Sequence, residues 1–160
     1  MVDSWAALER AIAEAKSPAT ISVGGDFFAD SDVILAEKII CLTGSGVITR
    51  GAGVGGSLLT ITGGSLTLGG NVTLSGANAV GARSALVRVR GGELILLPGA
   101  TLRGNAGDGV CVEGGRFQMA GGRISENNGS GVSVTAGTFS WLLDDGLGFC
   151  PEKGWRPYGQ

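Results

Sequence analysis

A repeat of 22 to 28 residues, running from residue 58 to residue 141, is the feature that most constrains how this chain folds. Glycine pairs mark the repeat at Gly63-Gly64, Gly91-Gly92 and Gly114-Gly115, and Ala136-Gly137 follows as a near match. The steps between the pairs are 28, 23 and 22 residues. Periods in this range are typical of stacked repeat units and not of a closed globular core. The sequence therefore predicts a column of similar units.

Each glycine pair lies between two short stretches in which apolar and polar residues alternate. The stretches before the pairs are residues 59–62, 87–90, 110–113 and 132–135, and those after the pairs are residues 65–68, 93–96, 116–119 and 138–141. A third, shorter stretch follows at residues 72–74, 100–102 and 123–125. Because side chains point to opposite faces along a strand, each stretch predicts a β-strand with one apolar face.

The apolar faces align from one repeat to the next into four columns. The columns are Leu59/Val87/Val110/Val132, Ile61/Val89/Val112/Val134, Leu66/Leu94/Phe117/Phe139 and Leu68/Leu96/Met119/Trp141. The apolar residues of one coil cannot form a core by themselves, so the columns can be buried only if the coils stack. Three short strands and three turns per coil therefore predict an all-β fold, a parallel β-helix of about five coils with strands in register.

The segment from Gly114 to Val132 resembles the repeats of a known protein class. It combines a glycine pair, an alternating strand, a second glycine pair, a third strand and the asparagines Asn127 and Asn128. This pattern is similar to right-handed parallel β-helix proteins of the pectate-lyase-like class, and closest to bacterial polymorphic outer-membrane proteins and autotransporter passengers. The resemblance covers roughly residues 20 to 141 and implies a right-handed coil. It implies no single function, because that architecture includes lyases, hydrolases, adhesins and phage tailspikes.

Composition narrows the classes of function. Glycine accounts for 31 of the 160 residues, and without a collagen period this excess fits tight corners repeated in every coil. A formal net charge of -2 gives no electrostatic reason to expect nucleic acid or an anionic membrane as partner. The absence of histidine excludes Ser-His-Asp triads, histidine-ligated zinc and a histidine general base. We expect no cofactor and no metal site.

Neither the cysteines nor the N-terminus assigns a compartment. Cys41, Cys111 and Cys150 are an odd number; two of them can pair, but Cys111 aligns with outward positions, and we expect one exposed thiol. The N-terminus lacks a basic segment followed by an apolar one, and no apolar run approaches the ~18 residues of a membrane span. We therefore expect neither a signal peptide nor a membrane helix in this sequence. The chain is then either cytoplasmic or a piece of a longer secreted protein.

We predict one β-helix domain over residues 1–160, with a capping helix in 1–18, irregular first coils in 19–57, regular coils in 58–141 and a C-terminal cap or tail in 142–160. Asp3 or Ser4 should cap the helix, which runs to about Lys16 and lies on the open end of the first coil. Its apolar face consists of Trp5, Leu8, Ile12 and Ala15.

The first coils have an uncertain register. Strands are predicted at residues 20–23, 32–35, 39–42 and 47–49. Residues 26–32 are expected to be an irregular excursion whose Phe27 and Phe28 pack against the helix.

Loops that follow the third strands should stack on one side of the column. They are residues 50–57, 76–84, 104–108 and 126–130. Asn105 and Asn127 occupy matching positions in two of these loops, 22 residues apart. We predict that these asparagines are buried and hydrogen-bond to the next coil, since buried corners leave backbone groups that need partners.

Candidate binding residues lie on the outer face of the first strands, where the resemblance implies that chemistry would take place. The charged side chains of this face are Arg88, Arg90 and Glu113, and Arg116 beside Glu93 forms a second oppositely charged pair. Cross-strand ion pairs account for both groups, at about 0.2–1 kcal/mol each. One carboxylate is too few for calcium, which requires several oxygen ligands. We therefore assign Arg88, Arg90 and Glu113 to ligand binding and name no catalytic residue.

Two further motifs have an enzymatic or binding interpretation. Asp144-Asp145-Gly146 is similar to the adjacent aspartates of pectin-hydrolysing β-helix enzymes, but Asp-Asp-Gly is also an ordinary turn. A regular threonine face would suggest ice binding. Thr60, Thr62, Thr67 and Thr73 begin such a face, but the next coil has Arg88, Arg90, Ile95 and Thr101 instead.

We favour a non-catalytic, adhesin-like module of a bacterial surface or secreted protein. Such a module would bind carbohydrate or protein through its outer strand faces and stacked loops. The first alternative is a polysaccharide lyase-like carbohydrate-active enzyme, with Arg88 or Arg90 as base and Glu113 on a metal ion. The second is a structural module that oligomerises through an end coil. The sequence leaves the identity of the ligand, the assembly state and the compartment open.

Overall fold

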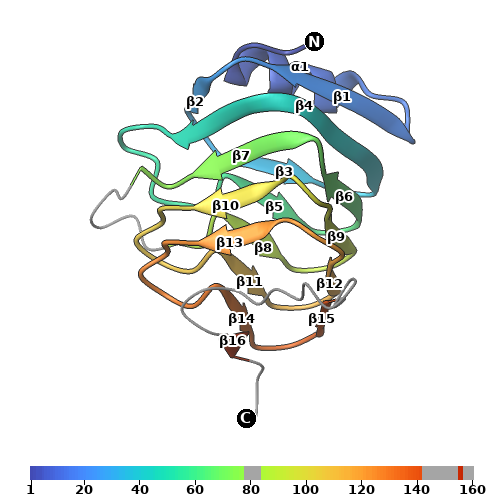
Figure 1. Cartoon of the computed structure of the whole chain (residues 1–160). Coiled ribbons are helices and arrows are strands. Elements are labelled where there is room, and N and C mark those ends of the chain that lie inside the picture. Colours follow the sequence, from blue (N-terminus) through green and yellow to red (C-terminus); the bar gives the residue numbers. More distant parts are fainter. Residues whose placement is uncertain (78–83, 142–154, 157–160) are drawn as a thin grey trace.

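A computed structural model describes residues 1–77 and 84–141 together with the backbone of residues 155–156. The chain forms a right-handed column of about five coils, with one short helix at its N-terminal end (Figure 1). All strand pairs in the described part of the chain are parallel. The right-handed turn is the sense that parallel crossover connections adopt. The predicted parallel β-helix is confirmed.

One face of the column is a six-stranded sheet with the order β16-β14-β11-β8-β5-β3, and we call it the first-strand sheet. Its strands are β3 (Val33–Leu35), β5 (Leu59–Ile61), β8 (Val87–Val89), β11 (Val110–Val112), β14 (Val132–Val134) and β16 (Trp155–Arg156). In β8, β11 and β14 the first and last residues of each strand are buried, and the middle residue is partly exposed. The middle residues therefore form an outward column.

The other two faces belong to one ten-stranded sheet, because β4 (Lys38–Arg50) runs across the corner between them. Residues 38–42 of β4 pair with β6 and residues 45–49 pair with β7, and Gly44 (φ 95°) lies between the two paired segments. The first arm contains β6 (Gly64–Leu68), β9 (Glu93–Leu96), β12 (Arg116–Met119) and β15 (Thr138–Trp141). The second arm contains β7 (Asn71–Ser75), β10 (Thr101–Arg103) and β13 (Arg123–Ser125). Every strand predicted for the regular coils is present.

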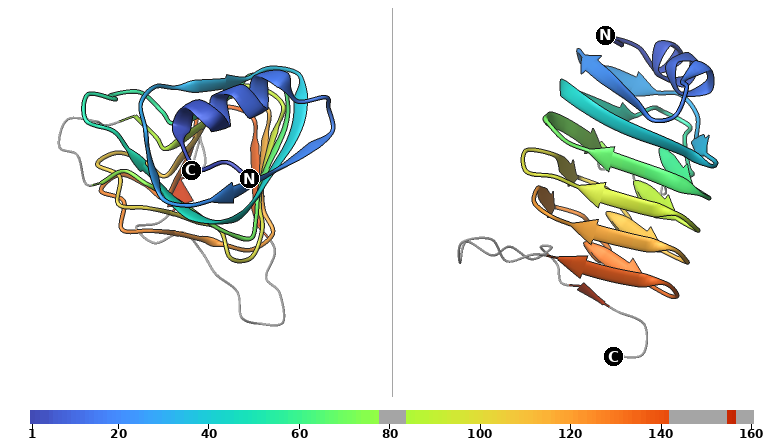
Figure 2. Two further views of the ribbon diagram at one scale, coloured as in Figure 1. Left: turned by 90° about the horizontal axis from the view of Figure 1, so that it is seen from above. Right: turned by 90° about the vertical axis from the view of Figure 1, so that its right-hand side faces the viewer.

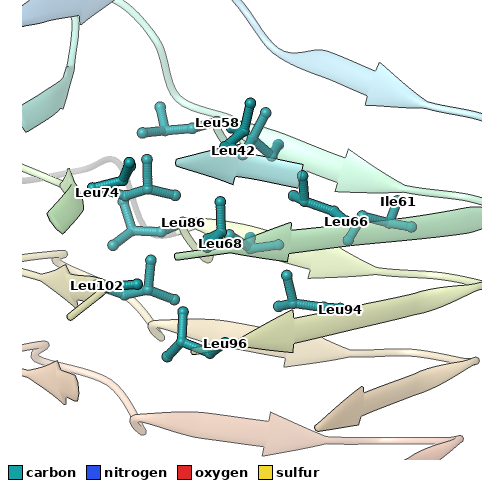
Figure 3. Packing of buried hydrophobic residues seen from close by; sticks show 14 of the residues in the cluster. Leu42, Leu58, Ile61, Leu66, Leu68, Leu74, Leu86, Leu94, Leu96 and Leu102 are labelled. Atoms are coloured by element: carbon teal, nitrogen blue, oxygen red, sulfur yellow. The ribbon is translucent and has the colours of Figure 1, made fainter. Parts of the chain in front are cut away.

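The interior of the column is filled by the predicted apolar columns. Leu94, Val89, Val112 and Phe117 are each 0% exposed. The leucines of successive coils lie above one another in the interior (Figure 3). At the lower end, the rings of Phe117 and Phe139 stack with their centroids 4.9 Å apart. The core is therefore one continuous stack.

The N-terminal end of the column is covered by α1 (Trp5–Glu14), which lies across it (Figure 2). Ser4 caps the helix by accepting a hydrogen bond from the Ala7 N–H at 3.1 Å. Trp5, Leu8 and Ile12 are buried, as predicted for the apolar face. The Lys38 ammonium donates hydrogen bonds to the carbonyls of the last helical turn, Ile12 and Ala13, at 2.8 Å each. A cation at this position complements the negative end of the helix dipole.

Three predictions for residues 19–57 are wrong. The strands expected at 39–42 and 47–49 are one strand, β4, because its glycines let the backbone turn the corner without breaking the sheet. Phe27–Ala29 forms β2, which pairs with the end of β4, where an irregular excursion was expected. Phe27 packs against the core, but Phe28 points outward and is 64% exposed, since adjacent residues of a strand face opposite sides. The remaining strand of this region is β1 (Ala19–Gly24).

Glycine is required at the corner before each second strand for two separate reasons. Gly92 and Gly115 both have φ 69°, in the left-handed region that side chains disfavour. A Cβ atom on Gly115 would also lie 2.5 Å from the Gly92 carbonyl oxygen of the coil above. The glycine pairs of the repeat are thus points where one coil rests on the backbone of another.

We expect Gly115→Ala to lower the free energy of unfolding by roughly 2–4 kcal/mol, since it adds a clash between coils to the cost of left-handed backbone. Gly53→Ala is the matched control, because Gly53 (φ 87°) has positive φ but a Cβ atom there would meet no other atom within 4 Å. The control substitution should lower the free energy of unfolding by only about 1–2 kcal/mol. Chemical denaturation measures both values. Equal losses would show that Gly115 is required only for its φ angle.

Candidate functional site

The candidate binding residues lie together on the outside of the first-strand sheet. Arg88 is the outward middle residue of β8, and Arg90 follows the end of that strand on the same face. Glu113 follows β11, one coil further along. The backbone pairing extends to these positions, because the Arg90 N–H donates to the Ile61 carbonyl at 2.8 Å and the Glu113 N–H donates to the Val89 carbonyl at 2.7 Å. The in-register stacking therefore brings the three side chains together.

Glu113 bridges the two arginines. Its Oε1 accepts a hydrogen bond from Arg90 Nε at 3.1 Å, and its Oε2 lies 3.5 Å from Arg88 Nε. The Arg88 Nε atom is buried and forms no hydrogen bond within the described residues, so the second contact is electrostatic. The side chain of Arg90 is 56% exposed, whereas those of Arg88 and Glu113 are 31% and 32% exposed. The predicted cross-strand ion pairs are present.

This cluster of Arg88, Arg90 and Glu113, which we call the Arg-Glu-Arg cluster, has more positive than negative charge. Two guanidinium groups share one carboxylate, which leaves one positive charge in excess. At this degree of exposure, water screens each pair, and each contributes about 0.2–1 kcal/mol to stability. The cluster therefore matters more as a fixed arrangement of charged groups than as a source of stability.

Cys111 lies beside the Arg-Glu-Arg cluster on the same outward column. Its Sγ atom is 3.8 Å from Glu113 Oε2. Burial of the thiol, followed by the negative charges of Glu113 and Asp108, raises the pKa of Cys111 to about 11. The thiol points outward as expected but is only partly exposed, and both Cys41 and Cys111 are free. Cys111 is therefore a neutral, weakly reactive thiol at neutral pH.

Hydroxyl groups border the Arg-Glu-Arg cluster above and below. Thr62 precedes Arg90 by one coil, and its hydroxyl donates to the Leu35 carbonyl at 3.2 Å. Thr135 follows Glu113 by one coil, and its hydroxyl donates to the Val112 carbonyl at 3.4 Å. Thr60 also belongs to this face but is only 9% exposed. The threonines considered for an ice-binding face do not share one face. Thr60 and Thr62 belong to β5 and the residue after it, Thr67 belongs to β6, and Thr73 belongs to β7, and these strands lie on different faces.

The second predicted ion pair lies on the first arm of the ten-stranded sheet. Arg116 of β12 and Glu93 of β9 are register partners, and their Nε and Oε2 atoms are 3.4 Å apart. The Arg116 side chain is 58% exposed. This pair has the same type of contact as the Arg-Glu-Arg cluster, but with one arginine and on another face.

The described residues contain no group of three or more cysteine, aspartate or glutamate side chains placed to hold a metal ion. The Asp144-Asp145-Gly146 motif and Cys150 lie outside the described residues. Sequence reasoning placed the charged groups correctly. It missed the contact between Cys111 and Glu113, although their spacing of two residues in an outward-facing stretch is a signal for it.

Comparison with protein family models, curated proteins and solved structures finds no match for this chain. In the described part of the chain, α1 is too short and too polar to cross a bilayer, and no other helix is present.

We expect Cys111 to react slowly with iodoacetamide in a Cys41→Ser/Cys150→Ser variant. Raising its pKa from 9.0 to about 11 lowers the reactive thiolate fraction at about pH 8 roughly a hundredfold relative to the unfolded chain. The alkylation rate should keep rising until about pH 11, and Glu113→Gln should increase it near neutral pH by removing a negative charge. Mass spectrometry of timed samples measures the rate. Equal rates in the folded and urea-unfolded chains would contradict the assigned environment of the thiol.

Proposed function

We propose that this chain is a non-catalytic display module: a rigid β-helix whose outward side chains and stacked loops bind a carbohydrate or another protein. The resemblance of its repeats to the pectate-lyase-like class, and to polymorphic outer-membrane and autotransporter-passenger repeats in particular, supports a place in a bacterial surface or secreted protein. Many proteins of this architecture act by presenting a long, regular surface, and a rigid column is suited to that task.

The observation that carries this proposal is the Arg-Glu-Arg cluster on the first-strand sheet. Parallel pairing spaces the outward positions of adjacent coils about 4.8 Å apart, so the charged groups need no ordering when a ligand arrives. Arg90 uses Nε for its hydrogen bond to Glu113, which leaves its terminal nitrogens as donors for a ligand. The threonine hydroxyls of Thr62 and Thr135 add polar groups at the borders. Preformed polar groups of this kind favour recognition of a polar, extended ligand.

The geometry of the Arg-Glu-Arg cluster favours non-catalytic binding over the lyase alternative. An arginine can accept a proton only in its neutral form, whereas the ion pairs with Glu113 are made by the charged form. The carboxylate of Glu113 is already shared by two arginines, so binding a metal ion there would leave both arginines next to a second cation. We therefore prefer binding without turnover.

We expect an array of neutral and acidic oligosaccharides, together with a panel of immobilised proteins, to identify ligands that bind the wild-type chain. An Arg88→Gln/Arg90→Gln variant should bind them at least about tenfold more weakly, because charge-assisted hydrogen bonds are lost. Arg116→Gln is the matched control, since it removes an exposed, ion-paired arginine from another face. Unchanged binding by the double variant would show that the ligand does not bind through the first-strand sheet.

Enzyme activity and self-association are separated from binding by two further measurements. Uronate polymers with calcium, followed by ultraviolet absorbance of unsaturated product, should give no turnover. Turnover that disappears in an Arg88→Ala/Arg90→Ala variant would establish the lyase alternative. A concentration-dependent shift on a sizing column would instead favour the oligomerisation module.

A further inference from the structure

The predicted asparagine ladder is present at the corner that precedes the first-strand sheet. The Asn105 N–H donates to Asn127 Oδ1 of the next coil at 2.9 Å. The Asn105 side-chain amide donates to the carbonyls of Ser84 and Asp108 at 2.7 Å each. Both asparagines are 1% exposed. The ladder thus satisfies buried backbone groups and joins adjacent coils.

The ladder is interrupted one coil earlier. The strand register aligns Ser75, Arg103 and Ser125, so the residue that matches Asn105 and Asn127 in the earlier coil is Ala77. Ala77 has no side-chain amide, and its backbone has φ 58°. Its N–H donates to Ser75 Oγ at 3.2 Å and not to Asn105. Asn105 Oδ1 therefore lacks the backbone donor that Asn127 Oδ1 has.

Arg50, two coils before Asn105, supplies that donor. Its side chain is buried, with the residue 2% exposed. Nη2 donates to Asn105 Oδ1 at 3.0 Å and to the Ser84 carbonyl at 3.1 Å. Nη1 donates to the Val54 carbonyl at 2.9 Å and to the Gly56 carbonyl. One guanidinium therefore connects the 51–57 loop with two later coils.

The intervening coil leaves room for this contact because Gly76, the residue before Ala77, lies against the Asn105 side chain and has none of its own. A Cβ atom on Gly76 would lie 2.5 Å from the Asn105 Cα and 2.6 Å from its Oδ1. Any side chain at this position would therefore displace the amide that Arg50 reaches. The contact between Arg50 and Asn105 therefore requires glycine at position 76.

The four acceptors of Arg50 are all neutral, which makes the shape of the guanidinium important. Burial lowers the pKa of Arg50, and the charge of Asp32 acts in the opposite direction. A planar guanidinium presents donors in several fixed directions, whereas a lysine ammonium is a single compact point of charge. Only the planar group can hold the loop carbonyls on one side and the ladder on the other.

We propose that Arg50 is a splint: its guanidinium replaces the missing ladder group at Ala77 and holds the 51–57 loop closed over this corner. The splint continues the chain of side-chain hydrogen bonds from Asn127 through Asn105 to the end of β4. Its role is local, because its partners lie in the loop and in the adjoining corner. The proposal does not depend on which ligand, if any, the outer faces bind.

Amide hydrogen exchange of the full chain tests the splint, with Arg50→Met and Arg50→Lys as variants. The Val54 and Asn105 amides should exchange at least about tenfold faster in both variants, because the loop and the ladder open locally. The Glu113 amide follows the far end of β11 from Asn105 and donates to the Val89 carbonyl, and it should keep its wild-type rate. Arg103→Met, which removes an exposed arginine of β10, is the control and should change none of these rates.

Three results would overturn the proposal. The first is an unchanged exchange rate of Val54 and Asn105 in Arg50→Met. The second is an equal acceleration at Val54, Asn105 and Glu113, which would mean a general loss of stability. The third is a wild-type rate in Arg50→Lys, which would mean that charge alone suffices. If Arg50→Met does not fold, the comparison of these amides in Arg50→Lys still decides the question.

Discussion

The stacking of each coil's apolar side chains on those of the next is the interaction on which the rest of the structure depends. A buried leucine or phenylalanine contributes about 1.5–3 kcal/mol, but only if neighbouring coils cover it on both sides. Leu94 and Phe117 are register partners with 0% exposure, and the column residues of β5, β6, β8, β9, β11 and β12 are all 0–1% exposed. No single coil can obtain this burial alone, so each coil depends on its neighbours for stability.

The outer surface follows from the same register. Once the apolar residues of a strand point inward, the residues between them have to point outward at fixed spacing. That rule places Arg88, Arg90 and Glu113 together although they come from two coils. The N-terminal end needs a separate solution, which α1 supplies by lying on the first coil, held by Lys38 and by the hydrogen bond from Trp5 to Ser31.

The regular coils could be predicted because their signals are local. Alternation, glycine pairs and column spacing are all visible within one repeat, and strand pairing then follows from the period. The same reasoning found the Arg-Glu-Arg cluster and the asparagine ladder. The same reasoning wrongly divided β4 into two strands, since nothing local shows that Gly44 turns a corner inside a sheet.

Arg50 could not be found in this way, because two of its acceptors lie 34 and 55 residues away in sequence. Its place in the ladder becomes visible only when the coils are stacked and the Ala77 position is found to lack an amide.

Cross-linking across one coil boundary tests the in-register stacking most directly. Cys41 of β4 is the register partner of Thr67 in β6, and parallel partners about 4.8 Å apart are within reach of a disulfide. In a Cys111→Ser/Cys150→Ser background, Thr67→Cys should therefore form a disulfide with Cys41 on mild oxidation. Ser65→Cys, one outward position earlier on the same strand and about 7–8 Å away diagonally, should remain reduced. Failure of Thr67→Cys to cross-link, or equal cross-linking by Ser65→Cys, would contradict the stacked column.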